Sequence, residues 1–272
     1  MERTRLFAAV LAGAMLLICY ALILRGMFGQ WMTDEDMGHG IAVPFVILWV
    51  VWRERARWQA LPRRPSWWGF AFLAAGAAMQ FLAALGVGLF MGSLALLVSV
   101  AGVVVCLGGF ALLRAWAFPF LLALFMLPKL AIVYNQVTLP LQLMASRIAA
   151  WMLSAGGFGV IRDGNVLEVG GRRILVAEAC SGIRYLIPLA FLGVLLAYLY
   201  DPKPWMRGAL FALAVPLAIA GNALRIAASG AWPAVSAGTL HMVCGWCIFA
   251  LCLGALLAMR RLIDAVYSRC HA

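Results

Sequence analysis

The sequence predicts an all-α polytopic membrane protein with about eight transmembrane helices. Of its 272 residues, 66% are hydrophobic and only 11% are charged, whereas a soluble domain is about half apolar and about a quarter charged. The apolar residues also gather in stretches of about 20, the length that crosses a bilayer. A water-soluble globular protein is therefore excluded, because an apolar excess of this size must face lipid.

Eight apolar stretches are the expected spans. They lie near residues 6–27, 39–53, 67–85, 87–110, 114–129, 184–200, 208–227 and 241–259. The first follows a basic start, as in a signal peptide, but its apolar core is too long for one, so we expect it to remain as a span. No repeat or linker divides the chain. We therefore expect one transmembrane domain over residues 1–272, without a fused soluble C-terminal domain.

Basic residues indicate the orientation of these spans. The loop from Arg53 to Arg64 holds five arginines, and other Lys and Arg residues flank span ends on the same predicted side. The positive-inside rule assigns that side, with both termini, to the cytoplasm. Loop charge thus accounts for the net charge of +11. A nucleic-acid partner is not expected, because no Lys/Arg run is interleaved with aromatic residues.

The longest segment on the opposite, outward side covers residues 130–179. Within it, Pro140 is expected to start an interfacial helix with Gln142, Ser146 and Arg147 on one face. Further on, two short β-prone runs flank Gly170-Gly171, which is the pattern of a β-hairpin. We therefore expect an interfacial helix and a short hairpin just before the chain re-enters the membrane.

The sequence Glu178-Ala-Cys-Ser-Gly-Ile-Arg184 lies where this hairpin meets the sixth span. If Cys180 or Ser181 caps the helix, the exposed N–H groups and the helix dipole favour a thiolate, and Arg184 adds to the effect. A cysteine is otherwise usually a small packing residue. The neighbouring Glu178, Gly182 and Arg184 are hard to explain on a lipid-facing surface. Cys180 is therefore a candidate nucleophile.

Asn222 and Arg225 lie near the outer end of the seventh span and share a helix face, because they are three residues apart. A charged side chain there costs about 2.5–3.5 kcal/mol unless it snorkels or faces a polar interior. A snorkelling arginine is the simpler alternative. It does not, however, require an asparagine one turn below, so the pair is a candidate polar site.

His241 begins the last span on the same side. Together with a cysteine for attack and an arginine for the oxyanion, it would complete a set for acyl transfer. The pattern His241-x-x-Cys244-x-x-Cys247 also suggests a zinc or copper site, but one helix cannot close a tetrahedron with these three ligands. We expect no metal and no cofactor. His39, between two glycines, either joins the polar cluster or marks a turn.

These motifs resemble those of the exosortase/archaeosortase family of integral-membrane cysteine transpeptidases. The strongest similarity covers Val176–Arg184, followed in the same order by Asn222–Arg225 and His241. Supporting similarity lies at Gly38–Pro44, Phe118–Pro128 and Arg162–Asn165. Together the motifs are specific, and they extend over most of the chain.

The resemblance implies that Cys180 is the nucleophile, Arg225 stabilises the oxyanion and His241 is the general acid/base. The residues expected to support them are Glu178, Ser181, Gly182, Arg184, Asn222 and His39. The substrates implied are tail-anchored secreted proteins with a C-terminal sorting signal, made of a motif such as Pro-Glu-Pro, one transmembrane helix and a basic cluster. Cleavage at the outer face of the cytoplasmic (inner) membrane would pass through a Cys180 thioester, with transfer to a cell-surface glycan or lipid acceptor.

Two other functions use some of the same residues. In a transporter or scaffold subunit for surface-polysaccharide export, Asn222 and Arg225 would bind an anionic glycan or lipid head group, and the Cys180 thiol would not be needed. A serine intramembrane protease would need a Gly-x-Ser-Gly setting, and Ser181 is the only candidate for its nucleophile.

Overall fold

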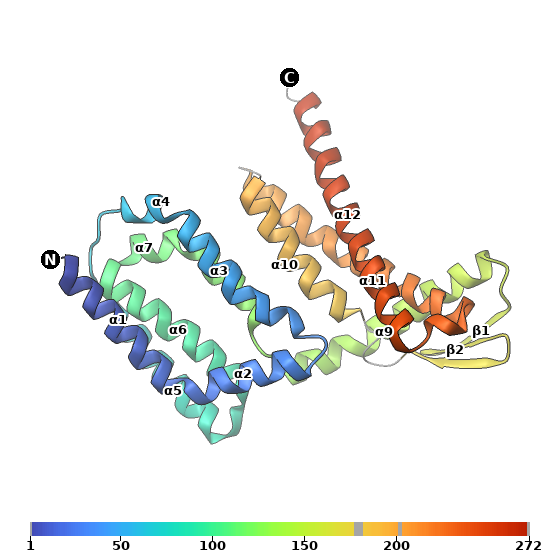
Figure 1. Cartoon of the computed structure of the whole chain (residues 1–272), viewed down its shortest axis with the longest axis horizontal. Helices are drawn as coiled ribbons and strands as arrows, with labels where there is room; N and C mark the ends of the chain where they lie inside the picture. Colours follow the sequence, from blue (N-terminus) through green and yellow to red (C-terminus); the bar gives the residue numbers. More distant parts are fainter. Residues whose placement is uncertain (1, 177–181, 201–202, 271–272) are drawn as a thin grey trace. The chain divides into compact units, whose positions relative to one another are not determined.

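The computed structural model describes residues 2–176, 182–200 and 203–270. It is mostly helical, with one small β-sheet (Figure 1). The chain forms two compact units, Met1–Leu130 and Ala131–Ala272.

Among the described residues, five helices are long and apolar enough to cross a membrane. They are Trp68–Val87, Leu89–Gly108, Ile183–Tyr200, Trp205–Ala231 and Gly238–Cys270. Two bent helix pairs, within residues 7–33 and 117–155, raise the number to seven if each is one span. A mostly helical multi-pass membrane protein is thus confirmed, but the count of eight is not. One reason is that α3 (Ala42–Arg53) has only 12 residues, too few to cross a bilayer.

The first unit begins with a bent helix pair. Helices α1 (Glu2–Cys19) and α2 (Ala21–Thr33) meet at an angle of 68°, where the sequence predicts one uninterrupted span. Tyr20 lies at the bend, and its buried hydroxyl forms a 2.8 Å hydrogen bond with Ser99 Oγ on α6 (Leu89–Gly108). This tether fixes the chain at the bend, because a buried hydroxyl must keep its partner.

Helices α5 (Trp68–Leu82) and α6 pack closely through small residues, and α5 continues into a π-helical turn, η2 (Ala83–Val87). A Cβ added to Gly76 would lie 2.1 Å from Ser99 Oγ, and one added to Gly102 would lie 2.9 Å from the Gly69 carbonyl oxygen. Membrane helices often associate through such small residues, which let their backbones approach. These helices coincide closely with two of the expected spans.

Short helices complete the first unit. They are η1 (Gly38–Ile41), α3, α4 (Arg55–Gln59), α7 (Phe110–Ala115), α8 (Ala117–Ala123) and η3 (Leu124–Met126). The acidic loop after α2 is held by Lys129, whose Nζ lies 2.7 Å from Asp34 Oδ2 and 2.8 Å from Asp36 Oδ2. Trp31 Nε1 donates to the Met126 carbonyl at 3.1 Å. These bonds join the loop to the segment that follows α8.

The second unit contains the sheet and the longest helices. Its elements are α9 (Ala131–Ala155), β1 (Val160–Asp163), β2 (Val166–Val169), β3 (Arg172–Leu175), α10 (Ile183–Tyr200), α11 (Pro204–Ala231), η5 (Pro233–Val235) and α12 (Gly238–Cys270). The strands are antiparallel in the order β1-β2-β3, with Val166 opposite Leu175. Gly170 and Gly171 join β2 to β3 with φ of 56° and 76°, the conformation of a type I′ turn. The expected hairpin region thus carries a third strand, β1.

The expected start of the interfacial helix is wrong. Helix α9 begins at Ala131 and runs through Pro140. The expected face is also wrong for Arg147, which is exposed, whereas Gln142 and Ser146 are buried. The two buried polar residues hold the sheet: Ser146 Oγ donates to the Gly164 carbonyl at 3.0 Å, and Gln142 Oε1 accepts from Asn165 Nδ2 at 3.2 Å.

The sheet packs on α9 and α11 through a buried apolar cluster. Its members are Ala145, Ala149, Leu153, Leu167, Val169, Val176, Ile226 and Ala227. Arg172 on β3 adds a polar bond, because its Nη2 donates to the Gly230 carbonyl at the end of α11 at 2.7 Å. The sheet is thereby fixed against the last turns of α11.

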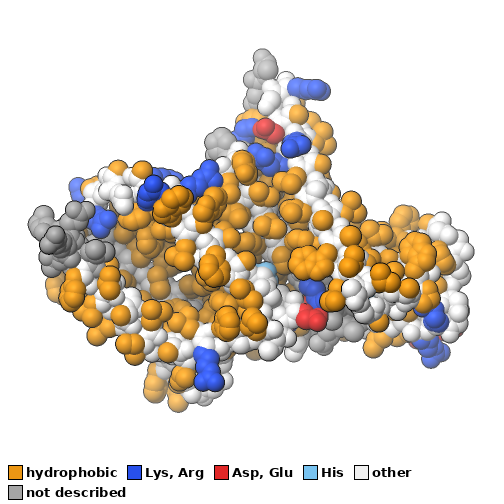
Figure 2. Space-filling view, in the orientation of Figure 1, with side chains coloured by type: hydrophobic (Ala, Val, Ile, Leu, Met, Phe, Trp, Pro, Cys, Tyr) orange, Lys and Arg blue, Asp and Glu red, His pale blue; other side chains and the backbone are white. Residues whose placement is uncertain are grey.

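The surfaces of both units are largely apolar. Figure 2 shows hydrophobic side chains over most of the visible face, with Lys and Arg in small groups. Leu22, Trp67 and Trp246 leave 81%, 86% and 74% of their area exposed. Large side chains exposed in this way indicate contact with lipid.

Candidate functional site

Arg225 is the central residue of the candidate site. It lies on α11, six residues before the helix ends at Ala231, and only 5% of its area is exposed. Its Nη2 donates a hydrogen bond to His241 Nε2 at 2.5 Å. Among the described residues no carboxylate forms an ion pair with it, and its Nε has no hydrogen-bond partner there. The guanidinium therefore keeps donors that the described residues do not use.

His241 is held from both sides of its ring. It lies in the first turns of α12, and its Nδ1 donates to the Val235 carbonyl in η5 at 2.9 Å. Its Nε2 faces the Arg225 guanidinium, which can only donate. The two bonds are satisfied together by the neutral imidazole with its proton on Nδ1. The lone pair on Nε2 thus points at Arg225.

Two residues of neighbouring helices lie against Arg225. Tyr185 on α10 is buried, and the Arg225 Cζ lies 5.7 Å from the centre of its ring, within the range of a cation–π contact. Gly245 on α12 is also buried and adjoins both side chains. Three helices, α10, α11 and α12, therefore meet at this site.

Gly182, two residues after Cys180, packs against Asn222 on α11. The Leu186 N–H donates to the Gly182 carbonyl at 3.0 Å, so Gly182 is the N-cap of α10. The expected cap, Cys180 or Ser181, is thus one or two residues too early. The φ of Gly182 is +88°, and a Cβ there would lie 3.2 Å from Asn222 Cβ. Both the conformation and the close approach favour glycine at this cap.

The other expected site residues fall into two groups. Glu178, Cys180 and Ser181 lie outside the described residues. Arg184 is half-buried in the first turn of α10. His39 belongs to the first unit, where its Nε2 donates to the Phe125 carbonyl at 2.8 Å.

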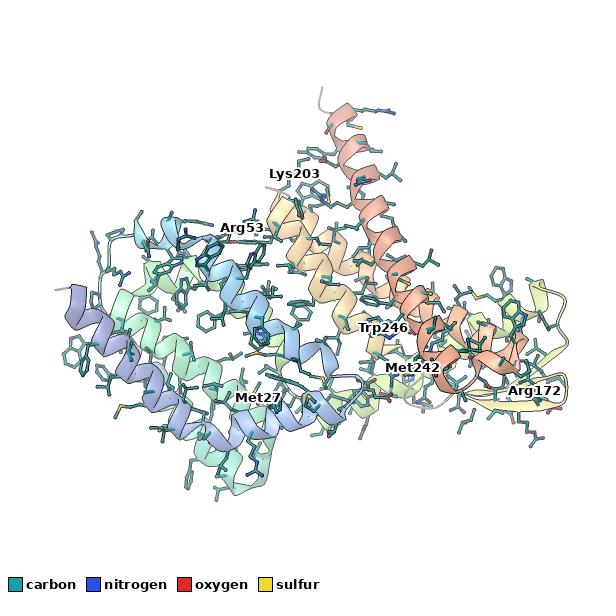
Figure 3. The ribbon with its side chains drawn as sticks, viewed as in Figure 1. Met27, Arg53, Arg172, Lys203, Met242 and Trp246 are labelled. Atoms are coloured by element: carbon teal, nitrogen blue, oxygen red, sulfur yellow. The ribbon has the colours of Figure 1, made fainter. Side chains whose placement is uncertain are left out.

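The site lies at one end of the second unit, and a basic cluster lies at the other. There Lys203 Nζ forms a 2.7 Å ion pair with Asp264 Oδ1, and Arg260 Nη2 donates to the Tyr200 carbonyl at 3.0 Å. Figure 3 shows Lys203 near one end of these helices and Met242, next to His241 in sequence, near the other. The two clusters therefore mark opposite ends of α10, α11 and α12.

Metal ligands are not gathered here. In the described ranges, no three His, Cys, Asp or Glu residues are arranged to hold an ion. His241 already uses both ring nitrogens, on Val235 and Arg225, and Cys247 is exposed.

The sequence did not single out Tyr185, Gly245 or Val235. A tyrosine and a glycine in apolar helices are typical packing residues, and a backbone carbonyl leaves no trace in a sequence. Gly245 carries one weak signal, because it lies one turn after His241 and so is on nearly the same face of α12.

The fold and this site define a helical membrane protein with a buried arginine bonded to a half-buried histidine at one end of three helices. A family model described as transmembrane exosortase matches residues 31–258. The chain therefore belongs to the transmembrane exosortase family, as its motifs indicated. Comparison with curated proteins and with solved structures gave no match.

Proposed function

We propose that the chain is a membrane-embedded cysteine endopeptidase and transpeptidase. In this proposal Cys180 is the nucleophile, Arg225 stabilises the oxyanion and His241 transfers protons. The observation that carries it is the Arg225–His241 contact at the end of the unit where the Cys180 motif joins α10. Membership of the exosortase family supports it as well.

Chain connectivity supports the place of the nucleophile. Gly182 packs on Asn222, and Asn222 lies one turn before Arg225 on α11. Two residues extend at most about 7 Å, so the Cα of Cys180 stays within that distance of the Gly182 Cα. A productive complex needs the thiol near hydrogen-bond reach of its base, and this tether keeps Cys180 in the neighbourhood of the pair.

The proposed first step is acylation. His241 takes the thiol proton, and the Cys180 sulfur attacks the scissile carbonyl carbon. An N–H of Arg225 donates to the resulting oxyanion. The C–N bond then breaks, His241 passes its proton to the leaving amine, and a thioester remains on Cys180.

The second step releases the product. An amine or hydroxyl of a surface glycan or lipid attacks the thioester carbonyl, and His241 takes the proton of that nucleophile. The C–S bond breaks, and the sulfur regains its proton from His241. Attack by water would give hydrolysis instead of transfer.

The Arg225–His241 bond suggests how the two roles are coupled. Before reaction, the His241 Nε2 lone pair accepts from Arg225 and is not available as a base. A developing oxyanion is a stronger acceptor for the arginine cation than a neutral imidazole is, because it carries a negative charge. Movement of the Arg225 donor toward the oxyanion would therefore free Nε2 for the proton.

We propose that the substrates are tail-anchored secreted proteins with a C-terminal sorting signal, cut at the outer face of the cytoplasmic membrane. The position of the site supports this orientation. It lies at the end of the helices away from Lys203 and Arg260, and the positive-inside rule assigns such basic ends to the cytoplasm. A substrate held by its own transmembrane tail would then present its motif at the level of the site.

The test is mass spectrometry of a reporter with a Pro-Glu-Pro-type signal, coexpressed in membranes with the wild-type chain, Cys180→Ala or Cys244→Ala. Cys244 is a matched control, since it is a free thiol one turn after His241. We expect a shortened reporter with wild type and Cys244→Ala, and an intact one with Cys180→Ala. Tail proteins encoded in the source genome serve as second substrates. If all stay uncut by the wild-type chain, the peptidase proposal is wrong.

A further inference from the structure

A contact between Tyr185 and Gly245 lies against Arg225 and has no part in the proton transfers above. Tyr185 leaves 5% of its area exposed. A Cβ added to Gly245 would lie 3.1 Å from the Tyr185 hydroxyl oxygen and 3.7 Å from Arg225 Nε. The distance from this Cβ to the Tyr185 hydroxyl is shorter than a normal carbon–oxygen contact. Tyr185 therefore fits against α12 only because residue 245 has no side chain.

The Tyr185 ring also contacts two side chains of neighbouring helices. It stacks with Phe249, one turn after Gly245 on α12, with ring centres 6.4 Å apart and an angle of 21°. The Arg225 Cζ lies 5.7 Å from the centre of the same ring. A guanidinium is attracted to an aromatic face, and the attraction grows when the pair is removed from water.

We infer that Tyr185 is a positioning residue for Arg225, and that Gly245 is the position whose missing side chain makes room for it. The consequence for catalysis rests on the proposed function. The packing of Tyr185 against Gly245 does not rest on that function, because it follows from the four distances above.

The physical reason is the freedom of the arginine side chain. The one hydrogen bond of Arg225 to a described residue goes to His241, and the proposed reaction releases it. Without a second support, the guanidinium would then be free to change rotamer. An aromatic face beneath it keeps the donors aimed at the reacting carbonyl, and donors held in place before the reaction are the effective ones.

The experiment combines Gly245→Ala, Tyr185→Phe and the double variant, with Gly254→Ala as the control. Gly254 is on the same helix, and a Cβ there meets nothing within 4 Å. Thermal unfolding in detergent gives Tm, and reporter cleavage gives kcat and KM. We expect Gly245→Ala to lower Tm and to lower kcat by about 10- to 100-fold with little change in KM. Gly254→Ala should match the wild type.

The double variant is decisive, because the new methyl group would meet the hydroxyl that Tyr185→Phe removes. We expect Tyr185→Phe to restore both the Tm and the kcat of Gly245→Ala, as coupled neighbours do. Tyr185→Leu, which removes the ring, should lower kcat as Gly245→Ala does. Additive effects of the two substitutions, or full kcat in Tyr185→Leu, would overturn the inference. If the wild-type chain cuts no reporter, the proposed function is wrong. The recovery of Tm in the double variant still tests the contact between Tyr185 and position 245.

Discussion

Replacing Arg225 with Met would separate a catalytic role from a structural one. Methionine keeps much of the length of the side chain but removes the charge and all its donors. The hydrogen bond to His241 is lost, at a cost of about 1.5–3 kcal/mol. The substitution also removes a buried charge that has no carboxylate partner among the described residues. The cost of burying that charge disappears with it, and this gain offsets a similar amount of free energy. We therefore expect the free energy of unfolding to stay within about 1 kcal/mol of the wild type.

The effect on catalysis should be much larger. Loss of one oxyanion donor typically costs about 2.7–4 kcal/mol, or about 100- to 1,000-fold in kcat. Purified protein in proteoliposomes, mixed with a tail-anchored reporter, gives the cleavage rate, and thermal unfolding in detergent gives Tm. Arg207→Met is the control, because Arg207 lies on the same helix with its Cζ 4.8 Å from the Tyr198 ring, far along α11 from Arg225. That variant should cleave at the wild-type rate.

Two results would contradict a catalytic role for Arg225. If Arg225→Met cleaves within a few-fold of the wild-type rate, Arg225 does not stabilise the oxyanion. If the variant no longer folds, Arg225 acts mainly in the structure, and the loss of activity says nothing about catalysis.

Three further substitutions, two of them with a matched control, test the packing at the site, in the first unit and under the sheet. Gly182→Ala should lower Tm more than Gly157→Ala does. Both glycines have a positive φ, 88° and 83°, but only at Gly182 would a Cβ lie close to a neighbour, 3.2 Å from Asn222 Cβ. Equal losses of Tm would contradict this close approach. Lys129→Met, which removes both ion pairs of the acidic loop, should cost about 2–3 kcal/mol of unfolding free energy in urea titrations. The exposed pair broken by Arg173→Met should cost less than about 1 kcal/mol, and the reverse order would contradict the burial of Lys129. Leu167→Ala, in the core under the sheet, should lower the free energy of unfolding by about 2–5 kcal/mol. It should also raise the rate of amide hydrogen exchange in the strands, and an unchanged rate would contradict the packing of Leu167 in that core.

The sequence predicted the long helices well, because an apolar stretch bounded by charges has few alternatives in a membrane. It did not predict the bend at Tyr20, where the tyrosine hydroxyl bonds to Ser99, 79 residues away, because such a distant partner leaves no local sequence signal. It also placed a helix start at Pro140, where α9 continues. Proline is favoured at a helix start, but membrane helices tolerate it inside as well, and sequence alone does not decide between the two.

The candidate site was predictable where a residue type is costly. A charged residue in an apolar helix needs a reason, and this singled out Arg225. The partner of that charge, His241, is 16 residues away on another helix, so their contact depends on how α11 and α12 pack. Tyr185 and Gly245 were missed because their types are ordinary in such helices and only their distances from Arg225 give them a role.

Nucleophilic catalysis by Cys180 would leave a covalent acyl-enzyme on this residue, and its detection is the most direct test. Purified chain is mixed with a tail-anchored reporter, quenched in acid, and analysed by intact-protein and peptide mass spectrometry. We expect a covalent adduct with the N-terminal part of the reporter on the peptide that contains Cys180. Hydroxylamine should release it, as it releases a thioester, and Cys180→Ala should lack it. Reporter cleavage that continues in Cys180→Ala, or an adduct on another of the seven cysteines, would contradict nucleophilic catalysis by Cys180.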